Sequence, residues 1–374
     1  MAPAIIDVSK ADDWRDVVHR AVQALAEGRL VAFPTETVYG LAASALDDSA
    51  IERLQQAKGR KLGHPFTLAL KSADEAHDYV PDMSTLARRL ARRCWPGPIT
   101  LVVDDSHPES LVRRLPQRAR EAVSPEKTIG LRVPGHQIIL DVLRMLAGPL
   151  ALTSANRTGE PEATHAHQIA ETLGGEVDLI LDDGPCRFGQ PSSVVRVVGN
   201  EFEILRAGVV PERTLRRLAS AMILLVCTGN TCRSPMAELF CRAMLAERLG
   251  CGPEDLEDRG HLVISAGIAA MSGGGASPEA IEVMSELGLD LSSHETQPLT
   301  EPLVRHADLI LTMTRSHREA IVAQWPEAAD RTLVLAPEGV DISDPIGGPI
   351  DRYRRCAAQI QDALRERLED MDLG

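Results

Sequence analysis

Aromatic side chains are scarce in this sequence of 374 residues: Phe, Trp and Tyr make up 3%, whereas 44% of the residues are hydrophobic and 25% are charged. The core must therefore rest on Leu, Val, Ile and Ala. No apolar run approaches the ~20 residues of a membrane-spanning helix, so we expect no membrane partner. The first residues lack the basic and apolar regions of a signal peptide, which favours a cytoplasmic location.

Paired metal-binding and disulfide patterns are also missing. The seven cysteines are an odd number, and neither a Cys-x-x-Cys nor a His-x-x-x-His pair occurs. Without a secretion signal, this usage argues against a disulfide framework and against a structural zinc site.

Lysine is absent from residues 221–374. This half contains 13 arginines and 25 acidic residues, so its charge of −12 makes up most of the net charge of −14. This composition does not suggest nucleic-acid binding, although it could steer basic protein substrates. The change near residue 220 predicts two domains, residues 1–210 and 221–374, joined by a linker over residues 211–220.

The hydrophobic pattern predicts an α/β protein whose two halves differ. In the first half helices are expected over residues 14–25 and 50–58, and strands over 30–33, 67–70, 99–103, 129–133, 193–198 and 203–206. Because these elements do not alternate strictly, we expect a mixed α+β domain. In the second half strands (222–226, 262–265, 309–313 and 332–335) alternate with helices (234–249, 278–287, 315–324 and 350–368). Such alternation indicates a doubly wound parallel sheet, with ligands at the carboxyl ends of its strands.

The strongest chemical signal is a short loop between an expected strand and an expected helix. Five residues separate Cys227 from Arg233, and Ser234 with a proline follows. This spacing lets the loop curl until its N–H groups point at one anion, and the start of the helix adds positive charge. A thiol held there favours the nucleophilic thiolate, and the arginine fork can hold two phosphoryl oxygens. The residues expected to bind phosphate are Thr228, Gly229, Asn230, Thr231, Cys232 and Ser234.

A thiolate nucleophile needs an acid that protonates the leaving group, and Asp344, in a loop before the last helix, is the candidate. Together with the cysteine loop it resembles the low-molecular-weight protein phosphatase family over about residues 221–370. The resemblance implies that Cys227 is the nucleophile, Arg233 the phosphate clamp and Asp344 the general acid. It implies a two-step displacement on a phosphorylated protein, with no metal or other cofactor.

Two positions bear on the substrate. The loop after Asp344 has Ile346 and two glycines where tyrosine-specific members carry tyrosines, and Thr231 replaces their aliphatic residue. This resembles the protein-arginine phosphatase branch, so phosphoarginine is preferred. Phosphotyrosine remains an alternative, whereas arsenate reduction is disfavoured because no cysteine lies between Cys251 and Cys356.

Four short pieces of the first half, residues 34–41, 58–60, 154–156 and 206–208, carry hydroxyl, amide and basic groups. With residues 95–100 and 132–134 they resemble the threonylcarbamoyl-AMP synthase (YrdC-like) family. The resemblance implies the activation of a carbamate by ATP, in which such groups can hold anionic carbamate and departing pyrophosphate. The resemblance implies a site made of Thr35, Lys58, Arg60, Arg132, Ser154, Asn156, Ser193 and Arg206.

The resemblance also implies a reaction, in which L-threonine, bicarbonate and ATP with Mg²⁺ give threonylcarbamoyl-AMP and pyrophosphate. The product would serve tRNA modification, with tRNA-modification proteins as partners. However, Ala69 stands where many members carry a histidine. This leaves an alternative open: a tyrosine phosphatase whose first half only binds RNA or a nucleotide.

Overall fold

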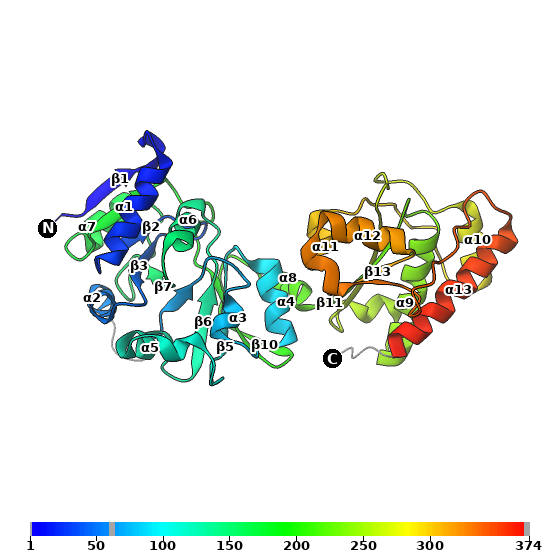
Figure 1. The fold of residues 1–374 in the computed structure, drawn as a ribbon, viewed down its shortest axis with the longest axis horizontal. Helices are drawn as coiled ribbons and strands as arrows, with labels where there is room; N and C mark the ends of the chain where they lie inside the picture. Colours follow the sequence, from blue (N-terminus) through cyan, green and yellow to red (C-terminus); the bar gives the residue numbers. More distant parts are fainter. Residues whose placement is uncertain (1, 60–63, 370–374) are drawn as a thin grey trace. The chain divides into compact units, whose positions relative to one another are not determined.

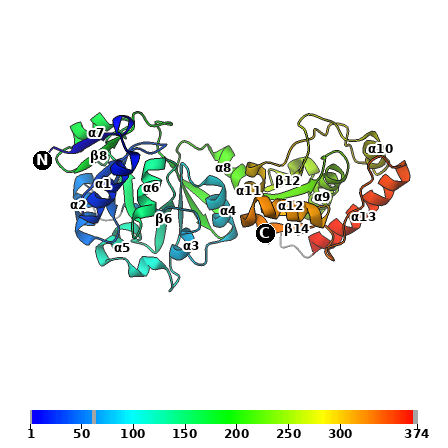
Figure 2. The same ribbon diagram turned by 45° about the horizontal axis from the view of Figure 1, so that its top comes forward.

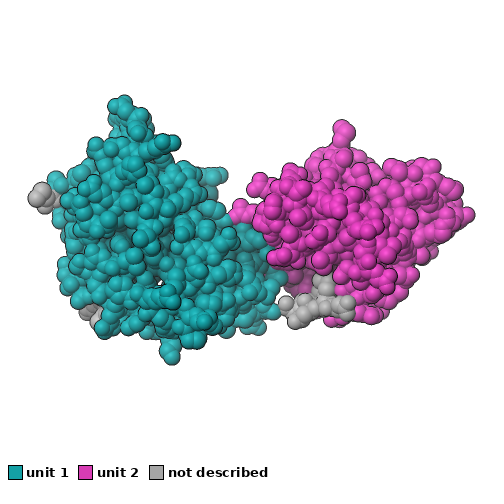
Figure 3. All heavy atoms as spheres, in the orientation of Figure 1, with its two compact units in different colours: residues 1–218 teal, residues 219–374 magenta. Residues whose placement is uncertain are grey.

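The structure, a computed structural model, describes residues 2–59 and 64–369. The chain divides into two compact units, residues 1–218 and 219–374, which Figure 3 shows in different colours. Each unit has a sheet and a hydrophobic core of its own. Within the described ranges no helix has both the length and the apolarity to cross a membrane.

The first unit is built on one mixed sheet of ten strands (Figure 1). Their order is β1-β8-β2-β3-β7-β4-β6-β5-β9-β10, so strands far apart in the sequence become neighbours. Parallel and antiparallel pairs are mixed, since β2 pairs with β8 in parallel and with β3 in antiparallel fashion. This confirms the α+β class expected for the first half. The strands are β1 (Ala4–Asp7), β2 (Val31–Phe33), β3 (Gly40–Ser44), β4 (Thr67–Ala69), β5 (Ile99–Asp104), β6 (Thr128–Arg132), β7 (Leu150–Ser154), β8 (Leu179–Asp182), β9 (Ser193–Val198) and β10 (Glu201–Arg206).

Aspartate side chains start two of the first unit's helices. Asp13 accepts the N–H of Arg15 at the start of α1, and Asp47 accepts that of Ser49 at the start of α2. These carboxylates satisfy free backbone groups and complement the positive end of the helix dipole. The helices are η1 (Val8–Lys10), α1 (Trp14–Ala26), α2 (Asp48–Lys58), α3 (Ala76–Tyr79), α4 (Thr85–Cys94), η2 (Leu111–Arg114), α5 (Gln117–Val123), α6 (Gln137–Met145), α7 (Ala166–Leu173) and α8 (Glu212–Ala219). Helix α8 occupies most of the expected linker.

Two central strands, β3 and β7, are missing from the elements that the sequence predicts. Both are rich in alanine and leucine and almost wholly buried, so neither shows the alternation that marks a half-exposed strand. They pair with each other in antiparallel register, with Gly40 opposite Ser154. The pairing brings together the motifs at residues 34–41 and 154–156, which are far apart in the sequence.

The second unit has a four-stranded sheet in which every pair is parallel, as the alternating pattern predicts. The strand order is β12-β11-β13-β14, with the strand that precedes the cysteine loop at the centre. The carboxyl ends of all four strands therefore meet at one edge, where loops can form a site. The strands are β11 (Ala221–Cys227), β12 (His261–Gly267), β13 (Leu309–Thr312) and β14 (Thr332–Val334).

Helices cover both faces of this sheet (Figures 1 and 2). On one face α9, α10 and α13 share a buried cluster with the sheet, and on the other α11, α12 and η4 share a smaller one. This is the doubly wound arrangement expected from the sequence. The helices are α9 (Arg233–Leu249), η3 (Pro253–Leu256), α10 (Pro278–Glu286), α11 (Glu301–His306), α12 (Arg315–Gln324), η4 (Pro326–Arg331) and α13 (Ile350–Glu369).

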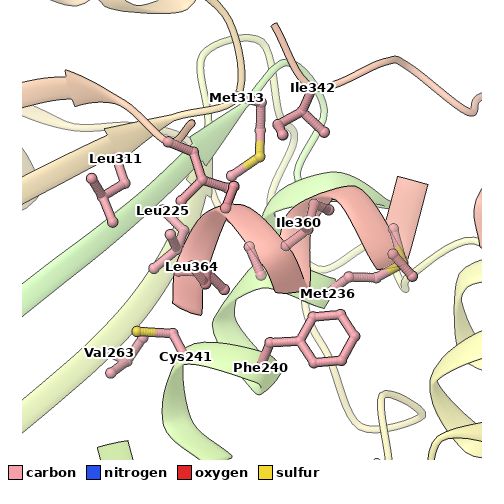
Figure 4. Close-up of a cluster of buried hydrophobic side chains, with 14 of the residues drawn as sticks. Leu225, Met236, Phe240, Cys241, Val263, Leu311, Met313, Ile342, Ile360 and Leu364 are labelled. Atoms are coloured by element: carbon pink, nitrogen blue, oxygen red, sulfur yellow. The ribbon is translucent and has the colours of Figure 1, made fainter. Parts of the chain in front are cut away.

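The larger cluster joins the central strands to helices α9 and α13 (Figure 4). Leu225 of β11 lies in it, fully buried, together with Phe240 of α9 and Ile360 of α13. The two helices thus rest on the strand that ends at Cys227. Packing in this cluster sets where the cysteine loop begins.

Leu225→Ala should lower the free energy of unfolding of the second unit by about 2–5 kcal/mol, because it leaves a cavity in a close-packed cluster. Hydrogen exchange of the full-length chain measures the change separately in peptides of residues 219–374 and 1–218. Leu287→Ala, at a side chain that is 52% exposed, is the matched control and should change protection little. Equal losses in both variants would contradict the packing described here.

Candidate active sites

The cysteine loop of the second unit curls at the carboxyl edge of its sheet, between β11 and α9. Cys227 is buried, with its Sγ 3.2 Å from the backbone N of Asn230 and 3.0 Å from Oγ of Ser234. The N–H donates to the sulfur, and the serine hydroxyl can do so as well. Both bonds fix the position of the sulfur within the loop.

Asn230 holds the curl of the loop. Its φ of 56° lies in the left-handed region, which non-glycine residues rarely adopt. Its fully buried side chain donates to Oγ of Ser234 at 3.0 Å and to Oγ of Ser265 at 2.9 Å, and it accepts the N–H of Gln297 at 2.9 Å. The ring of His294 contacts its backbone oxygen at 2.8 Å. These bonds offset the cost of the backbone conformation.

The segment after β12 packs directly against the loop. The N–H of Ile268 donates to the carbonyl of Cys227 at 3.0 Å, and that of Ala269 donates to the carbonyl of Thr228 at 2.9 Å. A Cβ added to Gly267 would lie 2.6 Å from the oxygen of Thr228 and 2.8 Å from the nitrogen of Asn230. Because both are backbone atoms, this position requires a glycine.

Arg233, the first residue of α9, joins the loop to the segment after β14. Its Nη2 forms an ion pair with Oδ2 of Asp344, and its Nη1 donates to the carbonyl of Ile342 at 3.3 Å. The arginine side chain is 5% exposed and that of the aspartate 43%. The structure thus brings together two residues that the sequence predicts, Arg233 and Asp344, across a separation of more than 100 residues.

The two loop residues before Arg233 face helices α10 and α13. Sγ of Cys232 lies 3.2 Å from Oγ of Ser277 and 3.8 Å from the hydroxyl of Tyr353, and it is buried. The carbonyl of Thr231 accepts the N–H of Ser277 at 2.9 Å. Ser277 also caps α10, so the start of that helix and the loop support each other.

Several groups around the loop were not predicted from the sequence: Ser265, His294, Gln297 and His317. Ser265 and His317 follow the general rule that residues at or just after the carboxyl ends of strands reach the site, a signal that could have been used. His294 and Gln297 lie in an irregular segment with no periodic pattern. Nothing in the sequence alone distinguishes them.

The first unit contains a cavity of about 200 Å³ beside the central strands. It is lined by four of the predicted residues, Thr35, Arg132, Ser154 and Arg206. Hydroxyl groups that were not predicted line it too. They are those of Thr67, Thr100, Thr128, Thr153 and Ser192.

Arg132 is held by a buried carboxylate. Its Nη2 donates to Oε1 of Glu36 at 2.8 Å and to Oγ1 of Thr37 at 2.9 Å, and both partners of the ion pair are 8% exposed. The second oxygen of Glu36 accepts the N–H of Gly135 at 2.8 Å. A buried ion pair with further hydrogen bonds fixes the guanidinium in one orientation.

Arg206 supplies the second guanidinium of the cavity. It donates to the carbonyl of Ser192 at 2.8 Å and to its hydroxyl at 3.1 Å. Burial lowers the pKa of Arg206; Glu162 opposes this shift and the charge of Arg132 adds to it. Two arginines near one cavity, of which one is paired with a carboxylate, favour an anionic ligand.

Lys58 braces the turn after β7 and is 2% exposed. Its ammonium group donates to the carbonyl of Ser154 at 2.7 Å, to Oδ1 of Asn156 at 3.0 Å and to the carbonyl of Asn156. The hydroxyl of Ser154 also donates to Oδ1 of Asn156 at 2.6 Å. The three predicted residues therefore form one cluster, of which Ser154 reaches the cavity.

The remaining predicted residues of the first half differ in their surroundings. The hydroxyl of Thr35 donates to the carbonyl of Val38 at 2.6 Å, and that of Ser193 lies away from the cavity, against the backbone of Val210 at 3.0 Å. Arg60 lies outside the described residues. Ala69 belongs to the hydrophobic cluster of the first unit rather than to the cavity lining.

Comparison with known proteins assigns each unit. Residues 23–208 match the Sua5/YciO/YrdC family, described as telomere recombination, and residues 222–373 match the low molecular weight phosphotyrosine protein phosphatase family. Threonylcarbamoyl-AMP synthase of Pyrococcus abyssi is 36% identical over 215 residues, 57% of this chain and 60% of its own length. The mouse (Mus musculus) enzyme of that name is 33% identical over 226 residues, 58% of this chain and 76% of its own length.

The second unit has relatives of its own. Protein-arginine-phosphatase of Bacillus subtilis is 38% identical over 148 residues, 38% of this chain and 92% of its own length. Among solved structures, Sua5 of Pyrococcus abyssi complexed with L-threonine superposes with a TM-score of 0.52 and 25% identity, covering 70% of this chain and 92% of its own. The chain therefore belongs to both families, the first unit to Sua5/YciO/YrdC and the second to the low molecular weight phosphatases.

Gly267→Ala should reduce the hydrolysis of an aryl phosphate by at least about tenfold, because the new Cβ would displace the backbone of the cysteine loop. Steady-state kinetics on the full-length chain measures the effect. Gly275→Ala is the matched control, since its Cβ would meet no atom within 4 Å. Normal activity in the Gly267 variant would contradict the close approach of the two segments.

Proposed function

We propose that the chain is a bifunctional enzyme. Its first unit makes threonylcarbamoyl-AMP from L-threonine, bicarbonate and ATP, and its second unit is a cysteine-dependent protein phosphatase. The observation that carries the second assignment is the loop that holds the sulfur of Cys227 on the N–H of Asn230 and leads into Arg233, whose guanidinium pairs with Asp344. The cavity lined by Arg132 and Arg206 supports the first.

In the phosphatase reaction the Cys227 thiolate attacks phosphorus, so that an S–P bond forms and the bond to the leaving atom breaks. The leaving atom takes a proton from Asp344. Arg233 and the loop N–H groups stabilise the negative charge on the transferred phosphoryl group. Water, deprotonated by Asp344, then attacks the phosphocysteine and releases phosphate and the free thiolate. Asp344 is suited to both steps because its ion pair with Arg233 keeps it beside the loop.

Phosphoarginine is the preferred substrate. Ile346 is 65% exposed and is followed by two glycines, so this segment offers no aromatic face for a phosphotyrosine ring. The leaving atom of phosphoarginine is a guanidino nitrogen, which can take the proton of Asp344. The similarity of residues in the second unit to protein-arginine-phosphatase agrees with this preference.

In the first unit, Arg132 and Arg206 would bind the anionic groups of carbamate and ATP, and the hydroxyl of Ser154 would hydrogen-bond to them. The described residues contain no group of three or more His, Cys, Asp or Glu side chains suited to a metal ion. A magnesium ion would therefore be held by the phosphates of ATP, whose charge it neutralises, rather than by a protein cage. The product would pass to tRNA-modification proteins.

Exchange of radioactive pyrophosphate into ATP that depends on L-threonine and bicarbonate tests the first activity. Gly208→Ala should reduce this exchange by at least about tenfold, because its Cβ would lie 2.4 Å from the nitrogen of Ser193 and 2.5 Å from the oxygen of Pro191. These atoms belong to the segment that holds Arg206. Gly175→Ala, whose Cβ meets nothing within 4 Å, is the control. Absence of exchange in the unmodified chain would instead favour an RNA- or nucleotide-binding module.

Cys227→Ser should abolish phosphatase turnover, because a hydroxyl in place of the thiol is a far weaker nucleophile near neutral pH. Asp344→Ala should slow poor leaving groups at least about tenfold more than good ones, since only the former need a proton. Release of phosphate from phosphoarginine and phosphotyrosine peptides measures specificity. Faster turnover of phosphotyrosine would reject the substrate preference, and full activity of the serine variant would reject the mechanism.

A further inference from the structure

His317 lies beside the cysteine loop, where its ring contacts Thr228 rather than Cys227 or Asp344. It is the third residue of α12, which follows β13 at the carboxyl edge of the sheet. Its Nε2 is 2.9 Å from Oγ1 of Thr228, the residue next to the nucleophile. The ring is only 8% exposed, and its Nδ1 is buried with no hydrogen-bond partner in the described part of the chain.

The Thr228 hydroxyl connects this ring to the phosphate clamp. Besides the imidazole, its Oγ1 contacts Nη2 of Arg233 at 3.4 Å and accepts from it. The guanidinium is otherwise held by the carbonyl of Ile342 and the carboxylate of Asp344. Of the three groups that hold the guanidinium, the Thr228 hydroxyl is the one that belongs to the cysteine loop. A fixed hydroxyl there keeps the guanidinium turned toward the loop.

The imidazole is suited to this role because it stays neutral. Burial, aided by the positive charge of Arg233, lowers the pKa of His317 to about 4, although Asp344 and Asp341 act in the opposite direction. An imidazolium would also bury a second N–H, at Nδ1, without an acceptor. In either neutral tautomer the ring bonds to the Thr228 hydroxyl, and this bond selects one side-chain rotamer of the threonine.

We propose that His317 is a positioning residue for the phosphatase site: it fixes the Thr228 hydroxyl, which in turn orients Arg233 for the phosphoryl group. This inference rests on the proposed phosphatase function. It assigns the histidine no contact with the substrate and no proton transfer. Its effect should therefore pass entirely through Thr228.

The test is a double-mutant cycle on the full-length chain, in which the dissociation constant of inorganic phosphate is measured first. His317→Ala and Thr228→Val should each weaken phosphate binding by about five- to tenfold. The double variant should show the same loss as the single variant that binds phosphate less tightly, with no further loss. Because a reversibly unfolded fraction would itself raise the apparent dissociation constant, each variant is titrated at a temperature at which circular dichroism shows it fully folded. Hydrolysis of an aryl phosphate, as kcat/KM, should fall at least as much.

Conservative variants and a surface control complete the design. His317→Gln, whose amide can still reach the hydroxyl, and Thr228→Ser, which keeps the hydroxyl, should restore most of the affinity. Glu319→Ala, at an exposed position of the same helix, should leave it unchanged. Independent losses that multiply in the double variant, or a His317→Ala variant with normal affinity, would overturn the proposal. If the variants change the affinity for phosphate as expected but the unmodified chain hydrolyses neither a phosphoester nor phosphoarginine, only the proposed function is rejected.

Discussion

The phosphate loop of the second unit depends on one buried amide side chain. Asn230 adopts a left-handed backbone conformation that turns its N–H toward the sulfur of Cys227. The conformation is unfavourable for a residue with a Cβ, yet the side chain of Asn230 joins the loop to α9, to β12 and to the segment at Gln297. Without these bonds the loop would open, and sulfur and guanidinium would no longer face one anion. A glycine would adopt the same φ but would form none of them.

Both sites contain two kinds of groups. Some face the ligand, and others hold the ligand-facing groups in position. In the first unit Glu36 and Lys58 are buried charges whose bonds are made within the protein, and they hold Arg132 and the turn after β7 in place. In the second unit, Asn230 holds the cysteine loop and the carbonyl of Ile342 holds Arg233. Such supports matter because an arginine or a thiolate that moves by a fraction of an ångström loses most of its effect on a transition state.

The parts of the site that could be predicted are those that lie close together in the sequence. The curl from Cys227 to Arg233 is a local feature, since spacing, strand and helix all fall within one short segment. Asp344 was predicted because a thiolate nucleophile needs an acid for the leaving group, and because its motif resembles that of a family. Ser265 in β12 and His317 in α12 could have been predicted from their places at or just after the ends of strands, whereas His294 lies in an irregular segment that carries no pattern. Likewise β3 and β7 were missed, since buried strands rich in alanine and leucine lack the period of two.

By itself the sequence determined the two families, the parallel sheet of the second unit and the chemistry of the cysteine loop, because local periodicity and short motifs encode all three. Only the tertiary structure decided which motif residues face a cavity and which support it. Ser154 reaches the cavity of the first unit, whereas Lys58 and Asn156 brace it and Ser193 lies away from it. The reason is that these contacts, like that between Thr228 and His317 across 89 residues, exist only once strand order brings distant segments to one edge of a sheet.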